Sequence, residues 1–344
     1  MILSVNDLAV DFTTGGGLLQ AVRGVSFSVS EGEIVGIVGE SGSGKSVTAH
    51  ALLRLIPANG EVTGGTVNYR GRDIYAMGTE ELRAYRGNEV AMIFQEPGRS
   101  FDPIYSIGRS LVETLRAHDP DISEEDARVR SITLLEEVHV DNAESRLENF
   151  PHQFSGGLLQ RVMIAHALAG DPAVLIADEP TTALDVTIQA GIIELLLELR
   201  RRRNLAVIFI THNLALISSF ADRIVVMYGG LMMEEGPAET VLTAPRHPYT
   251  TGLLASLVPF GAHYSDQALH ILAGTPPDPI NPEPGCPFAP RCPLRRDECG
   301  ASVPAVRNEE GASYRCIVPG IKQAELFSRG RADAGAAPET EAPQ

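Results

Sequence analysis

Residues 39–46 read GESGSGKS, and this stretch decides the fold. It follows the apolar run EIVGIVG at 33–39 and precedes SVTAHALLRLI, which has the composition of a helix. Between a strand and a helix, the pattern G-x-x-x-x-G-K-[ST] brings backbone N–H groups and a positive helix end to phosphate oxygens. A turn that only joins strand to helix is the alternative, and the flanking elements disfavour it. The stretch therefore predicts a nucleotide phosphate loop.

Each position in this loop has an expected task. The Lys45 ammonium reaches the β- and γ-phosphates, and the Ser46 hydroxyl takes Mg²⁺. The remaining contacts come from backbone amides and small side chains. The nucleotide-binding residues predicted in the loop are Gly39, Ser41, Gly42, Ser43, Gly44, Lys45 and Ser46.

A second apolar run, VLIADEP at 174–180, ends in two adjacent carboxylates. Neighbouring side chains on a strand point in opposite directions, so the two acids are free to take different tasks. We expect Asp178 to reach Mg²⁺ and Glu179 to act as general base on the attacking water. An acidic N-cap pair is the alternative, and it is disfavoured beside a phosphate loop. Hydrolysis of the nucleotide is therefore predicted.

The segment FSGGLLQR at 154–161 predicts a second anion site. Ser155, Gly156 and Gly157 open a helix, and free N–H groups at a helix start attract an anion. Taken alone, SGG is more often an ordinary N-cap and turn. Since one phosphate loop is already present, the interpretation is that this site serves a nucleotide held by another subunit.

The remaining pattern predicts an α/β fold with a buried, largely parallel sheet. Apolar runs at 90–95, 173–179 and 205–212 alternate with helical stretches. Alternation in DLAVDF, AVRGVSFSV and GGTVNYRGRDI predicts an N-terminal antiparallel sheet. A helical subdomain is expected at about 100–170, including a helix capped by Ser123, and a hairpin turning at Gly229 and Gly230.

The chain of 344 residues is expected to divide into three parts. Residues 1–258 form the nucleotide-binding domain, and 259–320 form an extension rich in Pro and Cys. TPPDPINPEPG at 275–285 has the composition of an extended linker. Residues 321–344 have too few apolar side chains to fold and are expected to be disordered.

The overall charge and the N-terminus narrow the possible environments. The net charge is −16, which disfavours nucleic acid as a partner, because such affinity comes largely from Lys and Arg. MILSVNDLAVDF lacks the basic and apolar regions of a signal peptide, so a cytosolic chain is expected. With no apolar run of membrane-spanning length, the chain is expected to serve a membrane only from its surface.

Taken in order, the motifs resemble those of ATP-binding-cassette (ABC) ATPases. The likeness is to the ATPase subunits of bacterial oligopeptide and dipeptide importers, a group that also includes nickel and glutathione importers. It covers about residues 2–316. The motifs that carry it are GESGSGKS, IFQEP, FSGGLLQRV, VLIADEPTTALDVT, THN, HPYT and the cysteine segment. Leu158 and Asn213 depart from the residues usual at those places, Gln and Asp.

The resemblance implies further site residues. Gln95 is the glutamine that contacts Mg²⁺ or water and reports to the membrane subunits. Asp185 crosses the interface of a cassette dimer, and His212 holds the γ-phosphate. Phe12 is the candidate for stacking on adenine, although a single Phe is usually a core residue.

The resemblance also implies the assembly. Two cassettes clamp ATP between the phosphate loop of one and the SGG of the other. Two transmembrane permease subunits, a second and paralogous ABC ATPase, and an extracytoplasmic substrate-binding protein complete the transporter. The chain then lies on the cytoplasmic face of the membrane, with ATP and Mg²⁺ as cofactors.

All four cysteines lie in the extension: Cys286, Cys292, Cys299 and Cys316. A cytosolic location disfavours disulfides, and four thiolates suit either zinc or an iron–sulfur cluster. No C-x2-C pair typical of zinc ribbons occurs, and two of the cysteines precede proline. Similar segments in the resembled family are linked to a [4Fe–4S] cluster in some members. A cluster is therefore preferred, with zinc or unligated thiols as alternatives.

Two other functions remain open from the sequence. One is an ABC-type ATPase that acts on nucleic acid or ribosomes, which the single cassette and the acidic charge disfavour. The other is a nucleotide-gated regulatory module that carries a cluster. The transported substrate has no signature in this chain.

Overall fold

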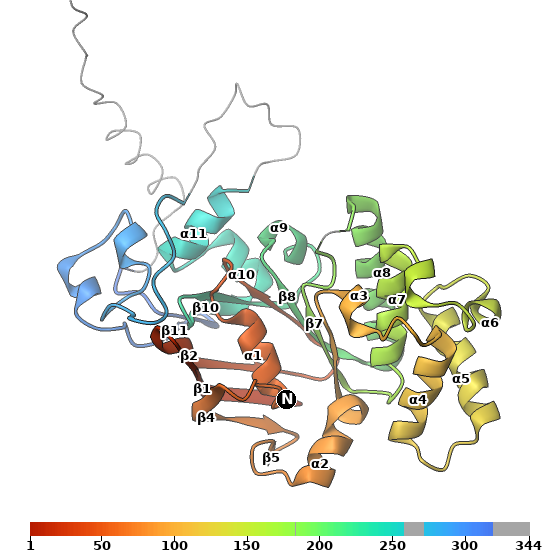
Figure 1. Ribbon diagram of the computed structural model, residues 1–344. Coiled ribbons are helices and arrows are strands. Elements are labelled where there is room, and N and C mark those ends of the chain that lie inside the picture. The colour runs from red at the N-terminus through yellow and green to blue at the C-terminus, as the bar shows by residue number, and fades with distance from the viewer. Residues whose placement is uncertain (183, 258–271, 319–344) are drawn as a thin grey trace, which may run out of the picture.

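The computed structural model describes residues 1–182, 184–257 and 272–318, and contains two sheets with helices packed around them (Figure 1). The larger sheet has the strand order β11-β12-β10-β9-β3-β8-β7-β6. Its strands are β3 (Ile34–Val38), β6 (Val90–Ile93), β7 (Val174–Asp178), β8 (Ala206–Thr211), β9 (Arg223–Tyr228), β10 (Leu231–Pro237), β11 (Arg307–Glu309) and β12 (Ala312–Tyr314).

The middle of this sheet is parallel. Strands β9, β3, β8, β7 and β6 pair in parallel in that order. The residues of β3, β7 and β8 are all buried, which explains why their sequences are nearly continuous apolar runs. Because the carboxyl ends of parallel strands meet at one edge, the loops after β3, β7 and β8 lie close together. The α/β prediction is confirmed.

The second sheet is antiparallel and has the order β2-β1-β4-β5. Its strands are β1 (Leu3–Thr14), β2 (Gly17–Val29), β4 (Gly60–Tyr69) and β5 (Arg72–Asp73). The long β1–β2 hairpin pairs from Leu3 with Val29 to Thr14 with Gly17. The alternating pattern in the sequence thus predicted the correct sheet type.

Helices from three parts of the chain surround the sheets. Those from the phosphate loop to β6 are α1 (Lys45–Leu52), α2 (Thr79–Ala84) and η1 (Tyr85–Glu89). Between β6 and β7 lie α3 (Pro97–Ser100), α4 (Ile107–His118), α5 (Glu124–Glu137), α6 (Ala143–Arg146), η2 (Pro151–Gln153) and α7 (Gly156–Ala167). After β7 come α8 (Val186–Arg203), α9 (Leu214–Ile217), α10 (Ala238–Thr243), α11 (Pro248–Ala255), η3 (Ala289–Arg291) and η4 (Asp297–Gly300).

Two of the local structures predicted from the sequence, a helix cap and a hairpin turn, are confirmed. The Ser123 hydroxyl accepts a hydrogen bond from the Asp126 amide and caps α5. The β9–β10 hairpin pairs Tyr228 with Leu231 around Gly229 and Gly230. Both glycines have positive φ, as a two-residue hairpin turn requires.

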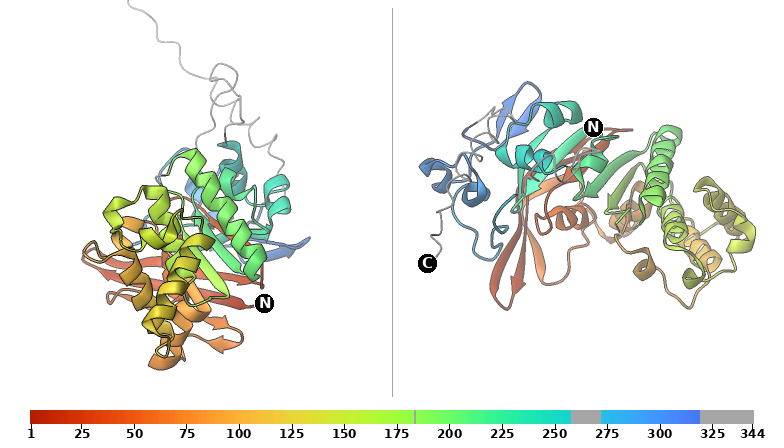
Figure 2. Two further views of the ribbon diagram at one scale, coloured as in Figure 1. Left: turned by 90° about the vertical axis from the view of Figure 1, so that its right-hand side faces the viewer. Right: turned by 90° about the horizontal axis from the view of Figure 1, so that it is seen from above.

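The described part of the C-terminal extension, residues 272–318, packs against the nucleotide-binding part. Strand β12 pairs antiparallel with β10, so the extension contributes an edge to the main sheet. Figure 2 shows the extension and the helices α4 to α6 at opposite ends of the molecule. The expected start of a second unit near residue 259 and the expected disordered tail lie outside the described residues, and the domain limits stay predictions.

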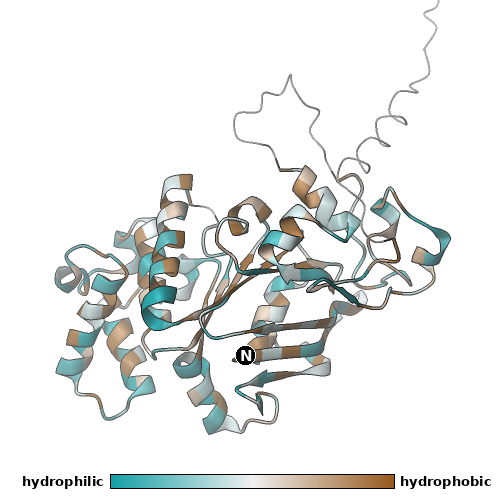
Figure 3. Cartoon of the chain, turned by 180° about the vertical axis from the view of Figure 1, so that it is seen from behind, coloured by the Kyte–Doolittle hydropathy of each residue, from teal (hydrophilic) through white to brown (hydrophobic). Residues whose placement is uncertain are grey.

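Two hydrophobic clusters form the core. One lies between the main sheet and the helices α4 to α11, and the other lies between the main sheet, α1 and the antiparallel sheet. In Figure 3 the strands of the main sheet are mostly apolar, whereas α4 and α5 alternate between apolar and polar faces. None of the described helices is long and apolar enough to span a bilayer. Packing on both faces holds the main sheet in place, and the predicted site residues lie at the carboxyl edge of that sheet.

Candidate functional site

The phosphate loop lines a cavity of about 780 Å³ at the carboxyl edge of the main sheet. The loop leaves β3 at Val38 and enters α1 at Lys45, as the strand–loop–helix pattern predicted. All seven predicted loop residues line the cavity, together with Gln95, Glu179 and His212. A cavity of this size between a phosphate loop and a carboxylate has room for a nucleoside triphosphate.

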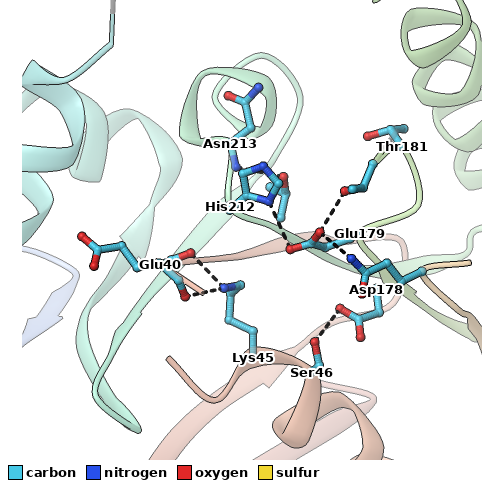
Figure 4. Close-up of polar contacts among 12 residues, drawn as sticks. Glu40, Lys45, Ser46, Asp178, Glu179, Thr181, His212 and Asn213 are labelled. Carbon is cyan, nitrogen blue, oxygen red and sulfur yellow. Dashed lines mark hydrogen bonds and ion pairs between the residues drawn. The ribbon is translucent and has the colours of Figure 1, made fainter. Parts of the chain in front are cut away.

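Lys45 already lies in the phosphate loop with its ammonium group directed at the loop backbone (Figure 4). Its Nζ donates to the carbonyl oxygens of Gly39 and Glu40, both at 2.8 Å. Burial lowers the pKa of Lys45, and the nearby carboxylates of Glu179 and Asp178 oppose that shift. Among the described residues, its hydrogen-bond partners are these two carbonyl groups and the Ser43 hydroxyl, so the buried ammonium is well placed to pair with an anionic phosphate.

Glu179 contacts three other side chains of the site (Figure 4). Its Oε1 lies 3.1 Å from Nδ1 of His212, and its Oε2 accepts hydrogen bonds from Thr182 Oγ1 at 2.8 Å and Gln95 Nε2 at 3.1 Å. Glu179 has a φ of 48°, and its amide donates to the carbonyl oxygen of Ile210 on β8. This strained turn directs the carboxylate into the cavity.

The electrostatics keep Glu179 ionised. Burial by itself raises its pKa, but hydrogen bonds from His212 and Thr182 outweigh burial, and the pKa lies below the ordinary value. A carboxylate that stays deprotonated at neutral pH, with donors fixing its orientation, is available to accept a proton from water.

Asp178 is directed to the other side of the β7 terminus. Its Oδ1 accepts a hydrogen bond from Ser46 Oγ at 3.1 Å. Burial raises the pKa of Asp178, and the bond from Ser46 partly offsets that shift. A hydroxyl and a carboxylate oxygen at the phosphate loop are the hard donors that Mg²⁺ prefers, so these residues fit the ion. The two adjacent acids therefore face different partners, but the turn at Glu179, which lies just beyond β7, sets its direction rather than the alternation along a strand.

The structure does not bring every predicted residue to this cavity. The Ser155 hydroxyl accepts from the Leu158 amide and caps α7, and Asp185 caps α8 through the Ile188 amide. Gly156 and Gly157 are the first two residues of α7, directly after Ser155. These four residues do not line the cavity.

Phe12 also lies outside the cavity lining. Its half-buried ring packs beside Gly60 of β4, against the core between the sheets. The adenine-stacking role of Phe12 stays a prediction. Its register partner on β2 is Leu19, which does line the cavity.

Several lining and supporting residues have no signal in the sequence. Leu19, Leu253 and Pro279 line the cavity, although they come from β2, α11 and the extension. The Glu40 amide donates to Tyr249 Oη at 3.0 Å, within the HPYT motif of 247–250. The motif was noted for the resemblance only, because no local pattern shows that its tyrosine supports the phosphate loop.

The four cysteines line one small cavity of about 20 Å³. Burial raises the pKa of Cys286 to about 11 and that of Cys292 to about 12, so both side chains are protonated thiols at neutral pH. In residues 1–182, 184–257 and 272–318, no group of three or more His, Cys, Asp or Glu side chains is arranged to hold a metal ion. The four cysteines share one cavity and are the donor types of a four-thiolate group, but their present arrangement is not that of a metal site.

Comparison with known proteins places these features in a family. A family model described as ABC transporter matches residues 22–182, and one described as oligopeptide/dipeptide transporter, C-terminal region, matches residues 233–299. The oligopeptide transport ATP-binding protein OppD of Bacillus subtilis (strain 168) is 47% identical over 291 residues, 84% of this chain and 81% of that protein. The chain belongs to the ATP-binding subunits of oligopeptide/dipeptide ABC transporters.

Further relatives agree with this placement of the ABC ATPase. The dipeptide transport ATP-binding protein DppD of Escherichia coli (strain K12) is 45% identical over 319 residues, 92% of this chain and 97% of that protein. Among solved structures, the dimeric post-hydrolysis state of the ATP-binding cassette MJ0796 bound to ADP and Pi aligns with a TM-score of 0.61 and 26% identity. That alignment covers 69% of this ABC ATPase and 98% of the cassette.

Proposed function

We propose that this ABC ATPase hydrolyses ATP to drive the import of di- or oligopeptides through a membrane transporter. The observation that carries the proposal is the position of Glu179, ionised and oriented by His212, Thr182 and Gln95 at the mouth of the phosphate loop. Peptides are the proposed cargo because relatives at 45–47% identity are named for dipeptide and oligopeptide transport. Nickel and glutathione are the alternative cargoes.

The chemistry follows from the residues of the cavity. Lys45 binds the β- and γ-phosphates, and His212 contacts the γ-phosphate. Glu179 accepts the proton of the attacking water as the bond between the γ-phosphorus and the bridging oxygen breaks, which leaves ADP and phosphate. Ser46, Asp178 and Gln95 would hold Mg²⁺, which would supply positive charge beside the phosphates.

The residues that cap α7 and α8 are proposed to act on a second nucleotide. Ser155, Gly156 and Gly157 present a helix N-terminus outside the cavity of their own chain, and Asp185 lies at the start of the next long helix. The dimeric structure of the cassette MJ0796 supports a two-cassette arrangement. We infer a pair of cassettes with two nucleotides between them, the second cassette being a paralogue.

The other proposed partners are two permease subunits and an extracytoplasmic substrate-binding protein. Gln95 and the helical subdomain of 100–170 are proposed to pass cassette closure to the permeases. This arrangement puts the chain at the cytoplasmic face of the membrane.

The four cysteines are proposed to hold a [4Fe–4S] cluster, with zinc as the alternative. Support comes from their shared cavity and from amides of Arg296 and Val318 that donate to the sulfurs of Cys299 and Cys316. Iron, acid-labile sulfide and zinc per chain, measured after anaerobic purification, separate the two. A Cys292→Ser variant should lose the bound metal, and a wild-type chain that carries neither iron nor zinc would contradict the proposal.

The function is tested by purifying the chain with its permeases from detergent-solubilised membranes and reconstituting the complex in vesicles. Peptide uptake should require ATP and should stop in the Lys45→Met variant. Vesicles that hydrolyse ATP and accumulate nickel or glutathione, but no peptide, would refute the peptide assignment. They would leave the ATPase assignment intact.

A further inference from the structure

The C-terminal extension reaches back to the nucleotide cavity. The Gln20 amide on β2 donates to the Pro279 carbonyl oxygen at 2.9 Å. The Ile280 side chain lies against Gly16 and Gly17, where a Cβ atom would come within 3.3 Å of it. The stretch predicted to be a linker is therefore held against the β1–β2 hairpin, and Pro279 stands exposed at the cavity.

The position of Pro279 in the cavity points to the base of the nucleotide. The phosphate loop and Lys45 mark where the phosphates bind, and Glu179 marks the γ-phosphate end. In Figure 1, β2 and β7 lie on opposite sides of α1, so the β2 side is the end away from Glu179. The apolar lining on that side includes Leu19 and Pro279. An apolar wall of this kind suits the face of a purine ring.

Arg291 joins the C-terminal extension to the phosphate loop. Its guanidinium donates to the carboxylate of Glu40, and to the carbonyl oxygens of Leu272 and Ala273, at 2.8–2.9 Å. The Arg291 side chain is only 6% exposed, so its ion pair with Glu40 is largely shielded from water. The Glu40 amide also donates to Tyr249 Oη. The extension and the loop that binds phosphate are thus joined by one buried side chain.

We propose that the C-terminal extension completes the nucleotide site: Leu19 and Pro279 form the wall on which the base lies, and Arg291 holds the extension to the phosphate loop through Glu40. Leu19 and Pro279 are base-contacting residues, whereas Arg291 is a positioning residue. This inference rests on the proposed binding of ATP.

The test compares two ligands on the purified full chain by calorimetric titration: ATP, and inorganic triphosphate, which has no base. Leu19→Ser and Pro279→Ser should each weaken ATP binding about five- to tenfold and leave triphosphate binding unchanged. That loss corresponds to about 1 kcal/mol, the value expected for about 40 Å² of apolar contact. Leu18→Ser, at the neighbouring exposed position of β2, and Pro284→Ser are the matched controls, since neither lines the cavity.

Arg291 needs a different readout because it acts through the loop. Arg291→Met and Glu40→Gln should weaken ATP and triphosphate alike. The double variant should lose no more than either single variant, since both remove the same ion pair. Glu40→Gln leaves the cysteine segment unaltered, so it separates a loop effect from damage to that segment. Additive losses in the double variant would overturn the positioning role.

The remaining outcomes are equally distinct. A wild-type chain that binds neither ligand overturns the proposed ATPase function and this inference together. Normal ATP binding in the wild type and in both wall variants overturns this inference alone. A base-specific loss in Phe12→Ala, with none in the wall variants, would assign the base to Phe12 instead.

Discussion

Replacing Glu179 with glutamine should abolish turnover while leaving the site assembled. The amide has nearly the same shape as the carboxylate. Its oxygen accepts the hydrogen bonds of Thr182 and Gln95, and its nitrogen donates to His212 Nδ1 when that atom carries no proton. What the substitution removes is the ability to take a proton from water.

The expected loss in kcat is therefore that of a general base, about 10²- to 10⁴-fold. At ~1.4 kcal/mol per factor of ten, this raises the barrier by about 3–5 kcal/mol. ATP binding should change little, because Lys45 and the loop amides remain in place. Since hydrolysis no longer depletes the nucleotide, an ATP-bound dimer should accumulate.

Phosphate release at saturating ATP and Mg²⁺ measures the rate, and titration with ATP measures binding. Glu113→Gln is the matched control, because Glu113 is an exposed carboxylate on α4 that pairs only with Arg109 among the described residues. Wild-type turnover in Glu179→Gln would refute the assignment of the base. If Glu179→Gln binds ATP much more weakly but turns over at the wild-type rate at saturating ATP, Glu179 acts in binding instead.

Three further predictions concern stability. Arg203 pairs with both carboxylate oxygens of Glu137 and with Asp171, and only 13% of its side chain is exposed. Because the substitution leaves a buried carboxylate without its partner, Arg203→Met should lower the free energy of unfolding by about 3 kcal/mol, measured by urea titration. The hydrogen bonds from Arg203 hold the pKa of Glu137 below its ordinary value. This stabilisation is present above the pKa of an unfolded glutamate and is lost as the pH falls through the lower folded pKa, so the difference between wild type and Arg203→Met should shrink below about pH 4. In β3, a Cβ on Gly36 would lie 2.3 Å from the Ile217 side chain, and Gly36→Ala should cost about 1–3 kcal/mol, whereas an unchanged melting temperature would contradict that packing.

Much of the catalytic site was predictable because its signals are local. The phosphate loop requires a glycine-rich turn between one strand and one helix, and VLIADEP places both acids at one strand end. The separate partners of Glu179 and Asp178 were expected from the alternation of side chains along a strand, whereas in the structure the left-handed turn at Glu179 separates them. The roles expected of His212 and Gln95 came from the resemblance. The structure shows that both residues line the same cavity as Glu179.

The gaps concern contacts between distant segments. The sequence of 275–285 has the composition of an extended linker, and nothing in it indicates that Pro279 pairs with β2. Phe12 came from the resemblance as the candidate for stacking on the base, and that role stays a prediction. The packing of its ring beside Gly60 depends on the pairing of β1 with β4, which no local pattern specifies.

By itself, then, the sequence determined the phosphate loop, the parallel strands, the β9–β10 hairpin and the cap of α5. Each of these depends on residues within one or two turns or strands of one another, where backbone preference and apolar periodicity act directly. Only the tertiary structure decided that β12 joins β10 and that Arg291 reaches Glu40, which lies 251 residues earlier in the chain. An ion pair across that separation depends on how the extension packs on the main sheet, because the entropy of closing so long a loop is offset only by the assembled core.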